Sequence, residues 1–283
     1  MRRGAALSGT LYVVGTPIGN LEDITFRAVR VLKEADLIAC EDTRQTRKLL
    51  EHYGISTPTI SYHEHNERER SGELVARLRE GISVALVSDA GMPLVSDPGY
   101  RLVREAIDAG VRVEAVPGAS ALLTALAASG LATDALHFGG FLPAKAGQRL
   151  RAIEALRDEP ATLIFFEAPH RILETLAAIE QIFGGRPVVV AREITKIHEE
   201  FLRGNLNDLR DAASQRAPRG EITLMIGPGE PVLQQVDSSQ SLKQRVEQLE
   251  TESGLDRKAA LKQAARERGL AKREAYKKLL LER

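Results

Sequence analysis

Two carboxylates stand among small residues in the segment Ser88–Gly99, which follows the apolar stretch Val84–Val87. Asp89 and Asp97 could accept hydrogen bonds from an ammonium group or a ribose hydroxyl of a ligand. Gly and Ala beside them leave room for a ligand next to the backbone, and the prolines hold the loop open. Asp97 could instead only form a turn with Pro98. The segment predicts a ligand-binding loop.

A second loop of this kind follows the apolar segment Val111–Ala115. Pro117 and Gly118 break the strand pattern, and Ser120 is placed to cap the Ala- and Leu-rich helical stretch after it. The first loop, Gly15–Asn20, has only two glycines of the dinucleotide-binding fingerprint, and the sequence contains no G-x-x-x-x-G-K-[ST] loop. Together the loops favour a pocket built largely from backbone groups over an ordinary dinucleotide or nucleoside triphosphate site.

Alternating strands and helices must position these loops. In the first half we expect strands at Leu11–Val14, Leu37–Cys40, Thr59–Tyr62, Val84–Val87 and Val111–Ala115, and helices at Thr25–Glu34, Thr43–His52, Asn66–Glu80 and Gly99–Ala109. This alternation predicts an α/β fold with a mostly parallel sheet covered on both faces. The loops would then meet at the carboxyl edge of the sheet, where open α/β sheets bind ligands.

A second α/β series follows a crossover at Leu131–Pro143. Its expected strands are Ala161–Phe165, Pro187–Val190, His198–Arg203 and Glu221–Ile226, with helices at Ala146–Arg157, His170–Ile182 and Leu206–Ser214. This series predicts a separate lobe with a mixed sheet. We expect lobes at 1–132 and 133–229, a linker at 230–240 and a small three-helix module, helix-turn-helix-like, at 241–283.

The charge of the chain is unevenly distributed. The chain is neutral overall, but Ser241–Arg283 carries 12 Lys or Arg against 7 Asp or Glu. Its helical patterns are Leu242–Glu250, Arg257–Arg268 and Lys272–Leu280, and its expected inward-facing residues are Leu255, Leu261, Leu270, Tyr276 and Leu279. A basic module on an acidic body predicts contact with a polyanion.

The composition bounds the class of protein. Hydrophobic residues make up 43% of the 283 residues, which is enough for well-packed cores. No apolar run approaches the roughly 18 residues of a membrane span. The single Cys40 excludes an intramolecular disulfide framework and a multi-cysteine zinc site. We expect a cytoplasmic protein without a membrane partner.

Several motifs together resemble one known family. They include EDTR at 41–44, SDAGMPLVSDPG at 88–99, VPGASA at 116–121, FFEAPHR at 165–171, AREITK at 191–196 and GEITLMIGP at 220–228. This set resembles the tetrapyrrole methylase superfamily of S-adenosylmethionine-dependent enzymes. Within it, the chain is similar to the subgroup that 2′-O-methylates a decoding-centre cytidine of 16S rRNA in the small ribosomal subunit.

The resemblance implies an active cleft between the two lobes that holds S-adenosylmethionine, in a protein that forms a homodimer. The matching positions imply cofactor contacts at Pro17, Asp89, Ala90, Gly91, Met92, Val95, Ser120, Ala121, Phe166, Glu221, Ile222 and Thr223. One departure is that several relatives have Gly-Gly-Asp-Pro where this chain has Ala90–Pro93. Met92 thus replaces a carboxylate, which leaves the roles of Asp89 and Asp97 open.

Glu41, Asp42 and Arg44 are the candidate catalytic residues, because they follow the second strand at the same sheet edge. A ribose 2′-hydroxyl is a weak nucleophile, so its methylation needs in-line placement and help in removing the proton. Glu41 or Asp42 could be that base, or could only cap the helix that begins at Thr43.

The remaining polar candidates concern RNA and metal. Lys145, Arg171 and Lys196 are candidate phosphate contacts, although Arg171 could equally form a salt bridge. The run 63–67, His-Glu-His-Asn-Glu, has metal-ligand residue types. Because a sulfonium methyl is already activated, we expect no metal and read this run as a solvated loop facing RNA.

Three functions stay open at this point. An RNA ribose methyltransferase accounts for the basic module. A small-molecule methylase acting on a tetrapyrrole would not require that module. A ribosome-binding factor with an inactive pocket is disfavoured by the intact loops at 88–99 and 116–121.

Overall fold

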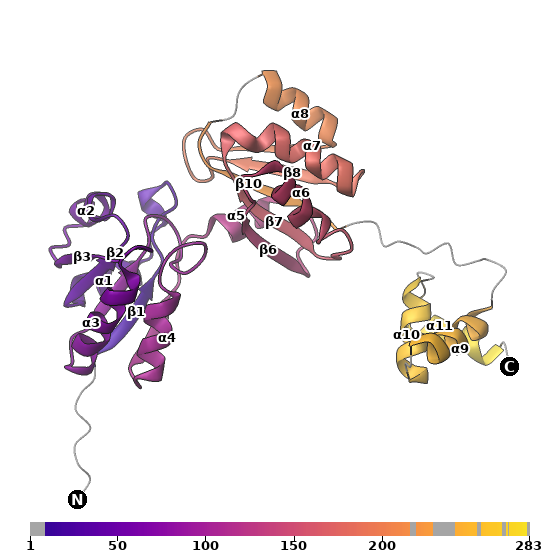
Figure 1. Cartoon of the computed structure of the whole chain (residues 1–283), viewed down its shortest axis with the longest axis horizontal. Coiled ribbons are helices and arrows are strands. Elements are labelled where there is room, and N and C mark those ends of the chain that lie inside the picture. Colours follow the sequence, from indigo (N-terminus) through magenta and orange to yellow (C-terminus); the bar gives the residue numbers. More distant parts are fainter. Residues whose placement is uncertain are drawn as a thin grey trace, which may run out of the picture.

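The computed structural model describes residues 9–215, 219–228, 241–253, 256–267, 270 and 272–281. Two five-stranded sheets, each with its own helices, form two α/β lobes, and three further helices gather in a cluster of their own (Figure 1). The expected fold class is confirmed. The linker expected at 230–240 lies outside the described residues.

The first sheet is entirely parallel, with the strand order β3-β2-β4-β1-β5. Its strands are β1 (Thr10–Val14), β2 (Leu37–Cys40), β3 (Thr59–Ser61), β4 (Val84–Val87) and β5 (Arg112–Val116). The helices between them are the 3-10 turn η1 (Leu21–Asp23), α1 (Phe26–Glu34), α2 (Thr43–His52), α3 (Glu67–Arg79) and α4 (Tyr100–Asp108).

Side chains of this sheet alternate between two separate cores. Ile38 of β2 packs in a cluster that includes Leu32 of α1. The next residue, Ala39, packs in another cluster that includes Leu74 of α3. Since successive side chains of a strand point to opposite faces, helices cover both faces of the sheet, as predicted.

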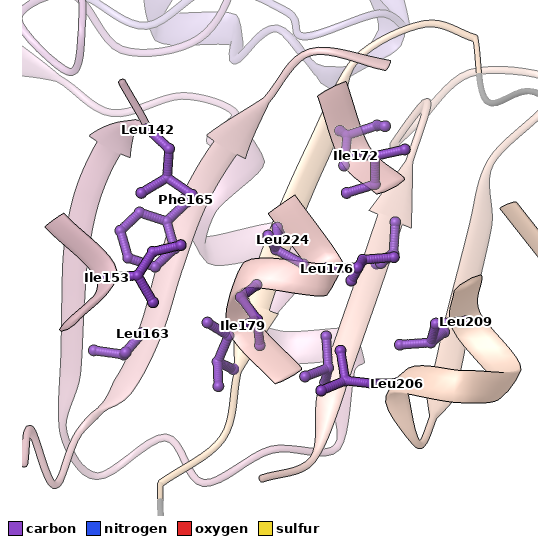
Figure 2. Close-up of a cluster of buried hydrophobic side chains, with 14 residues drawn as sticks. Leu142, Ile153, Leu163, Phe165, Ile172, Leu176, Ile179, Leu206, Leu209 and Leu224 are labelled. Atoms are coloured by element: carbon purple, nitrogen blue, oxygen red, sulfur yellow. The ribbon is translucent and has the colours of Figure 1, made fainter. Parts of the chain in front are cut away.

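The second sheet is mixed, with the order β6-β7-β10-β8-β9 and β6 parallel to β7. Its strands are β6 (Leu136–Phe141), β7 (Thr162–Glu167), β8 (Val188–Arg192), β9 (Glu200–Gly204) and β10 (Ile222–Ile226). The helices are α6 (Ala146–Glu154), the 3-10 turn η2 (Pro169–Arg171), α7 (Ile172–Phe183) and α8 (Leu206–Gln215). Figure 2 shows the core on one face, where Leu176 of α7 lies over strands carrying Phe165 and Leu224.

Strand β6 corrects the prediction of a crossover at 131–143. Its pairing with β7 shifts register between Phe138 and Phe141, around two glycines. A side chain at Gly139 would place its Cβ 2.4 Å from the Phe165 ring, so only glycine fits there. Gly139, part of a Gly-Gly pair that indicates a break when the sequence is taken alone, lets the strand pass Phe165.

Helix α5 (Ala121–Ser129) links the lobes by packing on the second sheet. Its Ala125 and Leu126 belong to a cluster with Val189 of β8 and Met225 of β10. The domain boundary expected between residues 132 and 133 stays a prediction. Helix α5 precedes that boundary in the sequence, yet it packs on the second sheet.

The basic module forms three helices, α9 (Leu242–Ser253), α10 (Arg257–Glu267) and α11 (Lys272–Leu281), around a small core. Leu261 is buried, and Leu270 and Leu279 pack against the core as expected. The expectation for Tyr276 is wrong, because 59% of its surface is exposed. Leu255 lies outside the described residues.

Candidate active site

The loops after β1 and β4 are joined by a two-residue antiparallel bridge. The Thr16 N–H donates to the Gly91 carbonyl at 2.9 Å, and the Gly91 N–H donates to the Thr16 carbonyl at 3.2 Å. The buried Thr16 hydroxyl lies 3.3 Å from the carbonyl oxygens of both Ser88 and Gly91. The start of the 88–99 loop is therefore held against the first loop.

The backbone of the 88–99 loop is strained. Its φ angles are 80° at Gly91, 72° at Leu94, 66° at Ser96 and 140° at Gly99. Left-handed conformations at residues such as Leu and Ser cost on the order of 1–3 kcal/mol, and they concentrate at ligand sites. The strain agrees with the prediction of a ligand loop.

A pocket of about 300 Å³ lies between the two lobes. The first lobe lines it with the loops after β1, β4 and β5, and the second lobe lines it with residues at the ends of β6, β7 and β10. The predicted cofactor residues that line it are Ala90, Gly91, Met92, Val95, Ser120, Ala121, Phe166, Glu221, Ile222 and Thr223. Ten of the twelve positions drawn from the family resemblance thus meet at one pocket.

Helix α5 presents its N-terminus to this pocket. Ser120 caps the helix, as predicted, because its hydroxyl accepts a hydrogen bond from the Leu123 N–H at 3.4 Å. Ser120 and Ala121 both line the pocket. The unpaired N–H groups of a helix start favour an anionic group.

Eight further residues line this pocket that the sequence analysis does not assign to the site: Ile18, Ser96, Asp97, Phe141, Glu167, Ala168, Pro169 and Gly220. Phe141 was missed because its strand, β6, was read as a crossover. Its ring lies 5.5 Å from that of Phe166 between centroids, so the two form one aromatic wall. The sequence indicates Asp97 as a possible hydrogen-bond acceptor but leaves its role open. Glu167 lies in the FFEAPHR motif, and this motif is the sequence signal that could have indicated it as a pocket residue.

Glu41 lies in an acidic environment and lines neither of the two pockets described here. Burial raises the pKa of its carboxyl above the ordinary value, and the negative charges of Asp89 and Asp97 raise it further. Burial also raises the pKa of Asp97, which lines the pocket. Carboxyls with raised pKa values are suited to taking up a proton.

Asp42 has a different role from Glu41. Its side chain accepts hydrogen bonds from the Arg44 N–H at 2.8 Å and from the Arg44 guanidinium at 2.7 and 3.0 Å. These bonds lower the pKa of Asp42 to about 2. Asp42 is the N-cap of α2, and its own N–H donates to Asp89 Oδ1 at 3.0 Å. Of the two readings for this carboxylate, the structure bears out the cap.

Pro17 and Asp89 line a second, adjoining pocket of about 410 Å³. It shares Ile18, Ala90 and Glu221 with the first pocket. Pro17 and Asp89 thus line a different pocket from the other ten positions. The cofactor contacts expected at these two residues remain predictions.

The three candidate phosphate contacts have separate surroundings. Arg171 donates to the fully buried Glu167 carboxylate at 2.5 Å, which is the salt bridge left open by the sequence. Lys196 lines the second pocket and donates to Glu193 at 2.8 Å and Glu221 at 3.0 Å. Lys145 is exposed at the N-cap of α6. Their contacts with a substrate stay predictions.

The 63–67 run shows local packing. The Asn66 side chain accepts a hydrogen bond from the His63 N–H at 2.9 Å, and the rings of His63 and His65 lie 6.0 Å apart. Across the described ranges, no group of three or more His, Cys, Asp or Glu residues is arranged to hold a metal ion. Nor does any helix in the described part of the chain have the length and apolarity to cross a membrane.

Two α/β lobes that enclose a pocket walled by strand-end loops define a two-lobed α/β enzyme. Residues 10–210 match the family described as Tetrapyrrole (Corrin/Porphyrin) Methylases, and the chain belongs to this family. It is an S-adenosylmethionine-dependent methyltransferase, as the motifs implied.

Close relatives cover nearly the whole chain. A protein of Halalkalibacterium halodurans named ribosomal RNA small subunit methyltransferase I is 51% identical over 95% of this chain and 93% of its own length. A protein of the same name from Bacillus subtilis is 44% identical over 96% of this chain and 94% of its own length.

Solved structures share the fold. Uroporphyrin-III-C-methyltransferase from Thermus thermophilus aligns with a TM-score of 0.54 and 22% identity over 77% of this chain and 94% of its own. Diphthine synthase aligns with a TM-score of 0.61 and 17% identity over 77% of this chain and 90% of its own.

The chemistry of the first pocket fits S-adenosylmethionine. Phe141 and Phe166 provide an aromatic wall for a flat base. A Cβ at position 91 would lie 3.2 Å from the Ile18 side chain, so any residue larger than Gly91 would crowd Ile18 at the pocket. The start of α5 offers N–H groups to a carboxylate. The described residues suit the base and the carboxylate of the cofactor.

Proposed function

We propose that this chain 2′-O-methylates a decoding-centre cytidine in 16S rRNA of the small ribosomal subunit. The observation that carries this proposal is the near full-length similarity to proteins named ribosomal RNA small subunit methyltransferase I. That similarity covers 97% of this chain at 50% identity in the relative from Mesorhizobium japonicum, and therefore includes the basic module.

In this proposal the inter-lobe pocket holds the cofactor, which supplies a methyl group already activated on sulfonium. Gly91 and the α5 N-terminus bind and orient it, and Phe141 and Phe166 exclude water from the base. Pro17 borders the adjoining space.

Glu41 is the better candidate of the two expected bases. Its raised pKa favours proton uptake, whereas Asp42 is held ionised by Arg44 and caps α2. We assign Asp42 and Arg44 a positioning role, since the Asp42 N–H donates to Asp89 and orients that carboxylate.

The alternative of a tetrapyrrole methylase has weaker support. The solved porphyrinoid methylases are about 22% identical or less and align over no more than 80% of the chain, so they speak for the fold alone. A small-molecule enzyme would not require the basic helices α9–α11.

We further propose that the enzyme acts in the cytoplasm as a homodimer. The dimer follows from the family resemblance, and Phe26 and Ile197, whose side chains are 98% and 97% exposed, are candidate contacts with a second copy. Light scattering behind a sizing column tests the dimer.

Incubation with methyl-labelled cofactor and 30S subunits tests the main proposal. We expect label on one cytidine ribose of 16S rRNA, mapped by nuclease digestion and mass spectrometry. Transfer to a porphyrinoid, or no transfer to RNA, would contradict it.

A further inference from the structure

The second pocket has a different chemical character from the first. It is lined by the loop after β1, by Ser88–Ala90 and by α2 residues that include Gln45 and Lys48. Lys196 and Glu221 of the second lobe also line it. Because Ile18, Ala90 and Glu221 border both pockets, a group in the second lies directly beside the contents of the first.

Its two lysines differ in electrostatic state. Lys196 is matched by two carboxylates, Glu193 and Glu221, which lie within 3.0 Å of its ammonium. Lys48 is exposed and donates to the neutral amide oxygen of Gln45 at 2.8 Å. That bond orients the ammonium without cancelling its charge, so Lys48 can attract an anion at the pocket mouth.

Asp89 supplies an acceptor on the same pocket. One of its oxygens accepts the Asp42 N–H at 3.0 Å, which fixes the direction of the carboxylate. An ionised carboxylate has about four acceptor sites, so capacity remains for a hydroxyl donor. A cation and a fixed acceptor on one pocket match a phosphate and an adjacent sugar hydroxyl.

We propose that this second pocket receives the acceptor nucleotide of the RNA, with Lys48 on a flanking phosphate and Asp89 on a ribose hydroxyl. The inference rests on the proposed function and assigns its substrate site. A nucleotide must leave its stack to bring its sugar into such a pocket, which is how enzymes reach groups buried in folded nucleic acid.

The test compares Lys48→Met with Lys33→Met, which removes an exposed lysine from the last turn of α1. Binding of unmethylated 30S subunits is measured by filter retention at several salt concentrations, and S-adenosylmethionine binding by calorimetry. We expect Lys48→Met to weaken subunit binding by about three- to tenfold and to reduce the salt slope by about 0.9, as loss of one phosphate contact does. Lys33→Met should match the wild type, and cofactor affinity should be unchanged in both.

Asp89→Asn provides the second arm. It keeps the side-chain shape but turns one acceptor into a donor, so we expect subunit methylation to fall at least about tenfold. Cofactor affinity should be retained if Asp89 faces the RNA, whereas a loss of cofactor affinity would make Asp89 a cofactor contact and overturn its role in this pocket. If the wild type methylates 30S subunits and both variants behave like it, the pocket assignment is wrong and the proposed function stands. If the wild type neither binds nor methylates subunits, the proposed function itself fails.

Discussion

Thr16 and Gly91 exchange two backbone hydrogen bonds, of 2.9 and 3.2 Å, across loops that are 75 residues apart in the sequence. This bridge makes the loops after β1 and β4 a single unit. The inter-lobe pocket therefore depends on the backbone conformation at Gly91, whose φ is 80°.

Gly91→Val should weaken S-adenosylmethionine binding by at least about tenfold. A β-branched residue is strained at positive φ, and its Cβ would meet Ile18 at 3.2 Å, which is the crowding that typically costs 1–3 kcal/mol. Calorimetry measures the affinity. Gly72→Val in α3, where a Cβ meets nothing within 4 Å, is the control. A folded Gly91→Val protein with normal affinity would remove this loop from the site.

Glu41→Gln should lower turnover by about 10²–10⁴-fold, the range for loss of a positioned base, while cofactor affinity persists. Single-turnover methylation of 30S subunits measures the effect. Asp42→Asn is the matched comparison, and its loss should be smaller because that carboxylate serves as a cap. Equal turnover in the wild type and Glu41→Gln would place the base elsewhere.

Glu41→Gln should also raise the melting temperature at neutral pH. The folded pKa of Glu41 lies above its unfolded value, so ionisation makes the folded state less stable as the pH rises through the folded pKa. Below the unfolded pKa both states are protonated and this loss is absent. The gain on substitution should therefore shrink from pH 7 towards pH 4 in calorimetric scans. A gain that is independent of pH would point to packing instead.

Arg171→Ala should lower the free energy of unfolding by about 3–5 kcal/mol, because it strands the buried Glu167 charge. Thr175 and the Ala168 N–H, at 2.6 and 2.7 Å, would remain as the partners of that carboxylate. Urea denaturation measures the change. Arg30→Ala, which breaks an exposed pair with Glu34, should cost less than about 1 kcal/mol. Similar costs for both would contradict a structural role for the Glu167 pair.

Truncation after Gly229 should leave a folded protein that binds S-adenosylmethionine normally. It should bind 30S subunits more weakly, with a shallower salt dependence, since the lost Lys and Arg residues no longer displace counterions. Salt-titrated filter binding gives both quantities. Unaltered affinity and slope would make α9–α11 a packing or dimerisation element.

Local sequence was enough for the first lobe. β2 and β4 have the predicted bounds because Leu37–Cys40 and Val84–Val87 are short apolar runs that end at polar residues. In contrast, Gly139 and Gly140 hid β6 in the sequence, because the close fit of Gly139 against Phe165 exists only once β7 is in place. Tertiary contact overrode the local turn signal there.

The site divided in the same way. Small residues in the loops predicted Gly91 and Ser120 as pocket residues. The ion pair of Glu167 with Arg171 depends on burial, which no spacing reveals. Likewise, the sequence after β2 does not distinguish the roles of Glu41 and Asp42. The pKa of Glu41 is raised by its burial, and Asp42 is the N-cap of α2, and both properties depend on the folded surroundings.

Strand β10 lies between β7 and β8 but is the last strand of its lobe to be synthesised. During vectorial synthesis, β7 and β8 emerge with no neighbour to fill the space between them, and each exposes an unpaired edge. The second lobe can therefore close its hydrogen-bond ladder only after Ile222–Ile226 has left the ribosome. Nascent chains halted before residue 222 would carry a finished first lobe and an open, chaperone-dependent second sheet.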